Sequence, residues 1–390
     1  MTSNYQLYTV FNSFGLAFKE FCHYFSHRRQ CRGISDHNKP THQQVQLVDA
    51  GTYTVIKSRI VATGPVPTMA REVLSPFASI EVAASTDESS LISLVQDAIG
   101  LIVRGVTPIS RRLIESGKEL RVIGRTGAGY DNVDIGAATE HGIPVVFAPG
   151  AGTRAVAEGA LLMLLALAKR LRELDHKTRV GRWAAREEVS IGDLYGATLG
   201  IAGLGRIGSQ VSRLAQAFGM IVIAYDPCVN EKVAAANGAK LVSFDELLGT
   251  ADFISLHAPL NEQTRGMIDA ERLRLVKRGA VLINLARGGL MPDLDVLYQA
   301  LESGTLSGLG LDVYPTEPPD TSHPIFRRAD VLCTPHCMGL SSRAARATFT
   351  MVSEGMAEVF LGRVPNNVVD PRVFSASNSR HTALVSKVNS

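Results

Sequence analysis

Cysteine is scarce in this sequence and is not arranged for structural use. The five cysteines among 390 residues form no CxxC pair, and five is an odd number. This pattern argues against a disulfide framework and against a zinc site, and it favours a reduced intracellular compartment, the cytoplasm. The sequence therefore predicts no metal ion.

An excess of charge of one sign and long apolar runs are also missing. The net charge is +3, which gives no reason to expect nucleic acid or an anionic membrane as a partner. The longest apolar candidate, from Ala160 to Ala168, stops at Lys169-Arg170 and falls short of the roughly 18 residues that a membrane-spanning helix needs. We expect a protein that binds neither nucleic acid nor a membrane.

What is present is the composition of a globular protein. Apolar residues make up 45% of the chain and charged residues 20%, and 390 residues comfortably fit two domains. Residues 1–57 are interpreted as a flexible N-terminal extension. The basic residues around Arg28 would also fit an organelle transit peptide, but Glu20 and Asp36 interrupt that character.

Short β-branched and apolar runs alternate with helical patterns from Ser58 onward. Such alternation implies parallel strands joined by helical crossovers. The first series of expected strands covers Arg59–Ala62, Ser79–Ala83, Ala98–Val103, Arg121–Gly124 and Pro144–Phe147. The second series covers Thr198–Ala202, Ile221–Tyr225, Phe253–His257, Ala280–Asn284, Gly308–Val313 and Val331–Thr334. The predicted fold class is therefore α/β, with two doubly wound parallel-sheet domains.

Two helices set the order of the predicted domains. A long helix from Val156 to Arg172 joins the two series, and a charged, irregular stretch around Trp183 follows it. A final helix from Arg343 to Phe360 could pack back on the first domain and make that domain discontinuous. The predicted ranges are 58–155 with 343–372 for the first domain, 156–342 for the second domain and 373–390 for a disordered tail.

The second series opens with the glycine pattern of a dinucleotide site. The GxGxxG segment Gly203–Gly208 directly follows a strand and precedes a helical pattern. In this context the first glycine permits a tight turn, the second lets the backbone approach a pyrophosphate, and the third lets the helix pack on the strand. The N-terminus of the helix offers free N–H groups to the phosphates.

Asp226 indicates which dinucleotide binds there. It ends the next strand, 18 residues past Gly208, close to the roughly 20 expected for an acid that holds the adenosine ribose hydroxyls. A carboxylate at this position would repel the extra phosphate of NADP, so NAD is the expected cofactor. The alternative is a structural strand–turn–helix unit with a surface aspartate.

Three charged or titratable side chains follow late strands of the second series. Arg287, Glu317 and His336 lie where open α/β sheets place their ligands. Reduction of a 2-keto acid needs a cation for the carboxylate and the carbonyl, which Arg287 offers as a fork of donors. His336 can donate the proton as an imidazolium, and Glu317 can hold the other ring nitrogen and fix the ring orientation. A nicotinamide supplies the hydride.

Each of these residues also has a structural alternative. A single His after a strand is more often structural than catalytic. Glu317 beside prolines could be a solvated turn residue, and Arg287 before two glycines could bind only a backbone carbonyl or a phosphate. Their joint placement after successive strands of a dinucleotide fold favours the functional interpretation.

Several segments together resemble one protein family. They are Gly127–Asp134, Ala155–Glu158, Thr198–Gly205, Asn284–Gly289, Leu311–Val313 and Thr334–His336. In this order they are similar to motifs of the D-isomer-specific 2-hydroxyacid dehydrogenases, a group that includes phosphoglycerate dehydrogenases and glyoxylate/hydroxypyruvate reductases. The resemblance covers about residues 58 to 372.

The resemblance implies a fold, a reaction and an assembly. The second domain would be a Rossmann NAD-binding domain inserted in a flavodoxin-like substrate domain. The protein would be an NAD-dependent dehydrogenase of a small D-2-hydroxy acid or reductase of its 2-keto acid, with Arg287, Glu317 and His336 as the catalytic set. Such enzymes close two domains around the cofactor, and they are usually homodimers through the cofactor domain.

The resemblance also implies which residues bind the cofactor and the substrate. The cofactor site would comprise Gly203, Gly205, Arg206, Ile207, Gly208, Asp226, Ala258, Pro259, Thr264, Leu285, Ala286 and Asp312. The substrate carboxylate would be cradled by backbone N–H groups of Arg104, Gly105, Val106, Gly127, Ala128 and Gly129.

The chain departs from the family pattern close to the site. Gly152 stands where the family often has Asn, and Cys337–Leu340 replaces the common Ile-Gly-Gly-Ser. These changes leave the chemistry intact but leave the identity of the hydroxy acid open. A phosphorylated substrate would need a further cation, for which Arg104 and Arg125 are available.

Two other functions use the same scaffold. A non-enzymatic, NAD-sensing corepressor-like protein would keep the three residues, but that relative has a Trp shortly after the catalytic His, and the only Trp here is Trp183. Formate dehydrogenases share the fold, but their pattern has Gln at the position of Glu317. The Glu in this chain therefore argues against that activity. The sequence favours the 2-hydroxyacid dehydrogenase.

Overall fold

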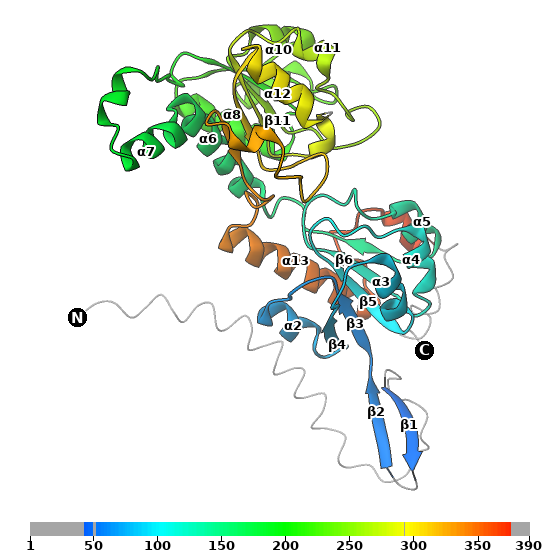
Figure 1. The fold of residues 1–390 in the computed structure, drawn as a ribbon. Helices are drawn as coiled ribbons and strands as arrows, with labels where there is room; N and C mark the ends of the chain where they lie inside the picture. Colours follow the sequence, from blue (N-terminus) through cyan, green and yellow to red (C-terminus); the bar gives the residue numbers. More distant parts are fainter. Residues whose placement is uncertain (1–42, 50–51, 292, 376–390) are drawn as a thin grey trace, which may run out of the picture. The chain divides into compact units, whose positions relative to one another are not determined.

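The computed structural model describes residues 43–49, 52–291 and 293–375 (Figure 1). Residues 1–42 of the predicted extension 1–57 and residues 376–390 of the predicted tail 373–390 fall outside the described residues. The first residues of that tail are ordered, because Val373 and Phe374 belong to the 3-10 helix η4 (Pro371–Phe374). Where the chain is described, none of its helices is both long and apolar enough to cross a lipid bilayer.

A two-stranded sheet precedes the first predicted strand. It consists of β1 (Gln43–Asp49) and β2 (Thr52–Lys57). No strand was expected before Arg59, and this expectation was wrong. The composition of β2 carries the signal that was missed, because Thr, Tyr, Val and Ile are all enriched in strands.

The first of two larger sheets has five parallel strands. They are β3 (Arg59–Ala62), β4 (Ser79–Val82), β5 (Ala98–Val103), β6 (Val122–Arg125) and β7 (Val145–Val146). Their spatial order is β4-β3-β5-β6-β7, which is the 2-1-3-4-5 order of a flavodoxin-like sheet. The expected flavodoxin-like sheet is confirmed, and no strand end differs from its expected position by more than one residue.

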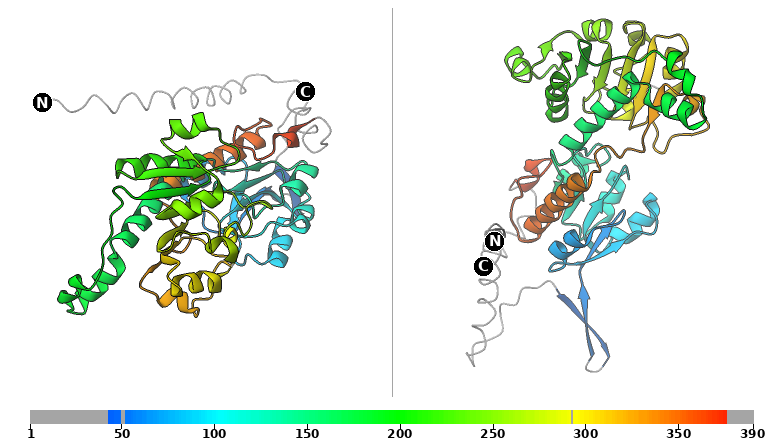
Figure 2. Two further views of the ribbon diagram at one scale, coloured as in Figure 1. Left: turned by 90° about the horizontal axis from the view of Figure 1, so that it is seen from above. Right: turned by 90° about the vertical axis from the view of Figure 1, so that its left-hand side faces the viewer.

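Helices cover both faces of this sheet. On one face α3 (Glu88–Val95), α4 (Arg111–Ser116) and α5 (Ile135–Glu140) share a buried apolar cluster with the strands. On the other face lie α2 (Thr68–Leu74) and α13 (Ser342–Phe360) (Figure 2). Helix α13 comes after all strands of the second sheet in the chain but packs on the first sheet. The final helix thus returns to the first sheet, as the sequence indicated.

The second large sheet has seven parallel strands. They are β8 (Thr198–Ala202), β9 (Ile221–Tyr225), β10 (Lys240–Leu241), β11 (Phe253–Leu256), β12 (Ala280–Asn284), β13 (Leu306–Leu311) and β14 (Val331–Cys333). The spatial order β10-β9-β8-β11-β12-β13-β14 is the Rossmann order 3-2-1-4-5-6 extended by one strand. Only β10 was not predicted, because two residues carry no readable pattern.

Helices also cover both faces of the second sheet. The cluster on one face includes α6 (Thr153–Ala168), α8 (Arg206–Ala217) and α9 (Glu231–Ala236). The cluster on the other face includes α10 (Phe244–Thr250), α11 (Ala270–Leu273) and α12 (Leu294–Glu302). The central strands are therefore buried on both faces, which explains their nearly continuous apolar sequences.

The predicted long helix from Val156 to Arg172 is two helices. Helix α6 starts earlier, at Thr153, and ends at Ala168, and Arg170 takes a left-handed conformation with φ of 51°. That conformation ends the helical path, and α7 (Leu171–Arg179) begins directly after it. The stretch around Trp183, expected to be irregular, contains the short 3-10 helix η1 (Trp183–Glu187).

The chain passes from one large sheet to the other at two places. The first passage leads from β7 into α6, and the second leads from β14 into α13. The two passages touch, because a Cβ atom on Gly152 would lie 3.5 Å from the carbonyl oxygen of Gly339. The two sheets are thus connected by two adjacent segments of backbone.

Replacement of Met356 by Ala tests the packing of α13 on the first sheet. Met356 is fully buried and its thioether fills the space over Gly124 of β6. We expect Met356→Ala to lower the free energy of unfolding by about 2–5 kcal/mol, measured by urea denaturation. Leu361→Ala, at an exposed position just after α13, is the control and should change stability by less than about 0.5 kcal/mol. Equal losses in the two variants would contradict this packing role.

Candidate functional site

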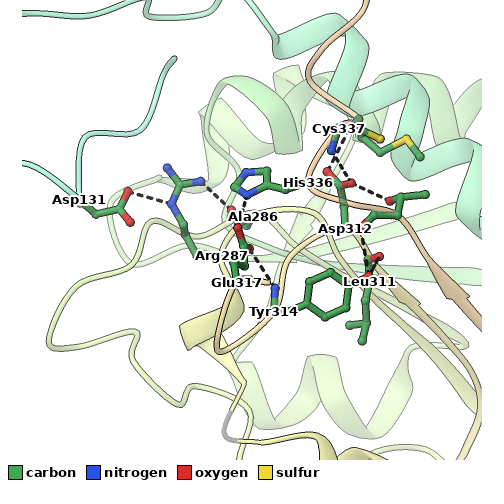
Figure 3. Close-up of polar contacts among 11 residues, drawn as sticks. Asp131, Ala286, Arg287, Leu311, Asp312, Tyr314, Glu317, His336 and Cys337 are labelled. Carbon is green, nitrogen blue, oxygen red and sulfur yellow. Dashed lines mark hydrogen bonds and ion pairs between the residues drawn. The ribbon is translucent and has the colours of Figure 1, made fainter. Parts of the chain in front are cut away.

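The three predicted catalytic side chains follow three neighbouring strands. Arg287 comes after β12, Glu317 after β13 and His336 after β14. Because the strands are parallel, their carboxyl ends lie at one edge of the sheet. Figure 3 shows the side chains of Arg287, Glu317 and His336 gathered at this edge.

Glu317 and His336 form a hydrogen-bonded pair. Nδ1 of His336 lies 2.8 Å from Oε2 of Glu317, and the N–H of Tyr314 donates to Oε1 at 3.1 Å. Burial raises the pKa of Glu317, but the bonds from His336 and Tyr314 and the nearby positive charge outweigh it, so the pKa lies below its ordinary value. The carboxylate is therefore an acceptor, and Nδ1 carries the proton. This leaves Nε2 as the ring nitrogen that can serve a substrate.

The backbone at His336 is held in an unusual conformation. Its φ is 49°, in the left-handed region that costs a residue with a side chain about 1–3 kcal/mol. The N–H groups of Cys337 and Met338 donate to the carboxylate of Asp312 at 2.9 and 3.1 Å. The hydroxyl of Thr334 donates to the same carboxylate at 2.6 Å. Asp312 is only 2% exposed. The three hydrogen bonds that its carboxylate accepts compensate the free-energy cost of burying the charge, and they fix the turn that orients His336.

Arg287 is held by groups that the sequence analysis did not assign to the site. Asn284, fully buried, accepts from the N–H of Ala286 at 3.0 Å and donates to the carbonyl of Arg287 at 2.8 Å. Nε of Arg287 donates to Oδ1 of Asp131 at 2.8 Å. Both residues lie in motifs quoted for the family resemblance, but their contacts depend on the folded chain and have no signal in the sequence.

The glycine-rich turn has the shape that a pyrophosphate requires. Gly203 has a φ of 97°, and a Cβ there would lie 2.8 Å from the carbonyl oxygen of His257. A Cβ on Gly208 would overlap the carbonyl of Gly203, whereas one on Gly205 would meet nothing within 4 Å. The turn is therefore closed toward the sheet and open at Gly205, where Arg206 and Ile207 begin the twelve-residue helix α8.

Asp226 is fixed at the end of β9. Its Oδ2 accepts from the N–H of Leu204 and its Oδ1 from the N–H of Cys228, both at 2.8 Å. These two bonds tie the carboxylate to the glycine-rich turn and stop it from rotating away. The acid and the turn thus belong to one site, as a bound adenosine ribose next to a pyrophosphate would require.

The other predicted cofactor residues lie in the loops after β11 and β12. The hydroxyl of Thr264 donates to the carbonyl of Pro259 at 2.5 Å, which closes the loop that contains Ala258. Leu285 is buried and Ala286 is bound to Asn284. Both loops leave the same edge of the sheet as the glycine-rich turn.

Two of the six amides predicted for the carboxylate cradle are bonded within the protein. The N–H of Arg104 donates to the hydroxyl of Thr63 at 2.8 Å, and the N–H of Gly127 donates to the carbonyl of Arg125 at 2.9 Å. These two amides are occupied by the protein itself. The candidate donors that remain from the prediction are the N–H groups of Gly105, Val106, Ala128 and Gly129.

The two cations considered for a phosphorylated substrate are also engaged. The guanidinium of Arg104 donates to the carbonyl of Pro65 at 2.6 Å and lies 5.2 Å from the centre of the Phe349 ring. Arg125 donates to Asn132 at 3.2 Å. Burial, followed by repulsion from Arg287, lowers the pKa of Arg125 to about 10. Because Arg125 interacts with Arg287, it is the one of these two cations that lies close to the site.

His257 at the end of β11 was not predicted as a site residue. Its Nε2 lies 2.7 Å from the hydroxyl of the buried Ser255, and its Nδ1 is buried without a hydrogen-bond partner among the described residues. Burial lowers its pKa to about 4, so the ring is neutral at physiological pH. Its backbone lies against Gly203, and a neutral ring there adds no charge to the cofactor turn.

The comparisons with known proteins place the chain in a family. Residues 161–338 match the family described as D-isomer specific 2-hydroxyacid dehydrogenase, NAD binding domain. A glyoxylate reductase of Korarchaeum cryptofilum is 35% identical over 324 residues, which cover 82% of this chain and 97% of that protein. The chain therefore belongs to the D-isomer specific 2-hydroxyacid dehydrogenase family, and it contains the family's NAD-binding domain.

Two further relatives define how far the similarity reaches. A D-3-phosphoglycerate dehydrogenase of Methanocaldococcus jannaschii is 40% identical over 313 residues, but these cover 80% of this chain and only 59% of that protein. The solved structure of the TT0316 protein from Thermus thermophilus has a TM-score of 0.74 and 36% identity, and covers 80% of this chain and all of that one. The chain thus spans between half and two thirds of the length of the phosphoglycerate dehydrogenases it matches.

A pH titration of stability tests how far the His257 ring is shielded from solvent. In the unfolded chain the ring takes up a proton near pH 6.5, whereas in the folded protein it does so near 4, so stability falls as the pH drops from 6.5 through 4. We expect this ring to contribute about 2 kcal/mol of the loss between pH 7.5 and 5, and His257→Asn to remove that part, measured by urea denaturation. An identical pH dependence of the wild type and His257→Asn would show that the ring is accessible to protons.

Proposed function

We propose that this chain is an NAD-dependent D-2-hydroxyacid dehydrogenase that interconverts a small D-2-hydroxy acid and its 2-keto acid. The observation that carries the proposal is the His336–Glu317 hydrogen bond of 2.8 Å beside Arg287, at the sheet edge that also holds the glycine-rich turn. An acid–base pair, a cation and a dinucleotide turn at one edge are the groups that this reaction needs. The family of the chain supports the same reaction class.

The glycine-rich turn and Asp226 fit NAD. The open side of Gly205 and the N-terminus of α8 would receive the pyrophosphate, and the clamped carboxylate of Asp226 would receive the adenosine ribose hydroxyls. When bound, NADH supplies the hydride for the carbonyl carbon. The proposed cofactor domain comprises residues 156–342, and the proposed substrate domain comprises 58–155 and 343–372.

His336 serves as the acid in reduction and as the base in oxidation. Because Glu317 occupies Nδ1, the proton is exchanged at Nε2. Glu317 stays ionised and orients the ring through its bond to Nδ1. Arg287 binds the substrate carboxylate and polarises the adjacent carbonyl, and Asp312 fixes the turn that carries His336.

The substrate is a small 2-keto acid such as glyoxylate or hydroxypyruvate. Support comes from the relative named glyoxylate reductase, which the chain covers almost completely. Arg104, one of the two candidate cations for a phosphate group, is bound within the protein. Arg125 is the cation that would meet a second anionic group of a substrate.

The active form is a homodimer in the cytoplasm. From the start of α7 to the start of β8 several large apolar side chains are exposed, namely Leu171, Val180, Trp183, Ile191 and Tyr195, with Trp183 at 68% and Tyr195 at 84%. Exposed apolar groups of this size in one segment are typical of a surface that another chain covers. The three cysteines in the described part of the chain are free thiols, as a reducing compartment would keep them.

A turnover assay tests the proposed reaction. Wild-type protein is mixed with NADH or NADPH and with glyoxylate, hydroxypyruvate, phosphohydroxypyruvate or pyruvate, and cofactor oxidation is followed at 340 nm, the nicotinamide absorption band. We expect turnover with NADH in preference to NADPH, because Asp226 repels the additional phosphate. His336→Ala should reduce kcat by about 10²–10⁴, because the proton donor is lost.

Binding of NADH provides the control for this assay. The His336→Ala variant should bind NADH as tightly as the wild type, measured by fluorescence titration, because the ring contacts the substrate side. Tight NADH binding by the wild type without turnover of any keto acid would refute the dehydrogenase and favour an NAD-sensing protein.

Light scattering after size-exclusion chromatography tests the dimer. We expect the wild-type particle to have twice the mass of the chain, and a Trp183→Lys, Tyr195→Lys double variant to be monomeric, because two charges would be buried at the interface. Val364→Lys, at another exposed apolar position that is 61% accessible, should stay dimeric. A monomeric wild type would reject the proposal.

A further inference from the structure

Arg287 is restrained on two sides of its guanidinium group. Its Nη1 donates to the carbonyl of Ala286 at 2.7 Å, and its Nε donates to Oδ1 of Asp131 at 2.8 Å. Asp131 lies in the loop between β6 and α5, and Arg287 lies after β12, 156 residues further along the chain. An acid of the first sheet's loop therefore binds the cation of the second sheet.

The same loop also contacts the end of the guanidinium. A Cβ atom on Gly129 would overlap Nη2 of Arg287, so the guanidinium occupies space that any other residue at position 129 would fill. Gly129 is one of the predicted donors to the substrate carboxylate. The Asp131–Arg287 contact thus brings the predicted cradle and the cation to one place (Figure 3).

A second positive charge makes this arrangement dependent on Asp131. Arg125 is partly buried close to Arg287, and burial, followed by repulsion between the two guanidinium groups, lowers the pKa of Arg125. Asp131 acts in the opposite direction on Arg125 and pairs directly with Arg287. Without this carboxylate the two like charges would repel, and Arg287, whose side chain is partly exposed, has solvent into which it can turn.

The contacts of Arg287 also leave donors for a ligand. A guanidinium has five N–H groups, of which one on Nε binds Asp131 and one on Nη1 binds Ala286. The remaining N–H groups, on Nη1 and Nη2, suffice for two parallel bonds to a carboxylate. In Figure 3 the Asp131 carboxylate and the His336 ring lie on opposite sides of the guanidinium, so Asp131 does not block the side that faces the ring.

We propose that Asp131 is a positioning residue for substrate binding, which holds Arg287 against Gly129 with its Nη groups directed toward the substrate. The inference rests on the proposed function, in which Arg287 binds the carboxylate of a 2-keto acid. Asp131 itself touches no substrate. Its carboxylate neutralises part of the charge of the Arg125–Arg287 pair and fixes the direction of the fork.

Replacement of Asp131 by Asn tests this role with little change in shape. An amide oxygen can still accept from Nε, but the negative charge that offsets two guanidinium groups is gone. We expect Asp131→Asn to raise KM for the preferred keto acid at least tenfold, with a smaller change in kcat and an unchanged Kd for NADH. Asp131→Glu restores the charge and should recover part of the loss. Asp134→Asn, three residues along and bonded to the N–H of Ala137 instead, is the matched control and should behave as the wild type.

Binding of oxamate, an unreactive isostere of a small 2-keto acid, gives a readout independent of turnover. Oxamate is titrated into the enzyme–NADH complex and its Kd is followed by quenching of NADH fluorescence. We expect its Kd to rise with KM in Asp131→Asn. In an Arg287→Lys background the same substitution should have much less effect, because Asp131 acts through the guanidinium.

The outcomes separate this inference from the function on which it rests. Wild-type turnover together with an unchanged or lowered KM in Asp131→Asn would overturn the positioning role, and a lowered KM would identify Asp131 as a competitor for Arg287. A wild-type protein that neither reduces keto acids nor binds oxamate would overturn the proposed function and this inference with it. An equal loss in the wild-type and Arg287→Lys backgrounds would also contradict it, since Asp131 would then act by another route.

Discussion

The hydrogen bond between His336 and Glu317 is the contact on which the organisation of the site depends. It joins the segments that follow β13 and β14, and it sets which ring nitrogen is left for chemistry. Asp312 supports this bond, because its carboxylate accepts hydrogen bonds from the two N–H groups that follow His336. These bonds hold His336 in its left-handed conformation. Two acids thus cooperate on one imidazole, one through its ring and one through its backbone.

The sheet on which this pair stands explains why so many distant segments meet. Each strand of a doubly wound sheet ends at the same edge, so a residue that follows any strand is brought near residues that follow the others. The glycine-rich turn follows β8, Asp226 follows β9, Arg287 follows β12 and His336 follows β14. Burial of the strands on both faces makes this edge rigid, since a shift of one strand would disturb two apolar clusters.

Much of this arrangement could be predicted from the sequence, because it depends on patterns that are local in the chain. Eleven of the expected strands and the return of α13 to the first sheet are present in the structure. The end of α6 was misplaced because its cause is a left-handed residue at Arg170, a non-glycine position that gives no composition signal. The two-stranded sheet of β1 and β2 was missed because the basic, acid-poor residues before it favoured an extension without structure.

The sequence predicted which side chains lie together at this edge of the sheet, but it did not predict their contacts. Arg287, Glu317 and His336 could be chosen because each follows a strand, but the occupied amides of Arg104 and Gly127 depend on Thr63 and Arg125 at positions that only folding brings near. The same holds for Asn284, whose side chain bridges Ala286 and Arg287. Hydrogen bonds between residues that are distant in the chain cannot be predicted from the periodicity of the sequence, because only the folded structure brings their partners together.

The two adjacent backbone passages between the sheets have a mechanical consequence. Gly339, in the second passage, is three residues beyond His336 and lies against Gly152 of the first passage. Two backbone connections that lie side by side restrict twisting between the two sheets more than a single connection would. Only a few residues of backbone separate this contact from the His336 ring. Asp312 fixes one end of that segment, and α13 follows its other end. The contact between the two passages is therefore joined by a short, fixed stretch of backbone to the turn that carries His336.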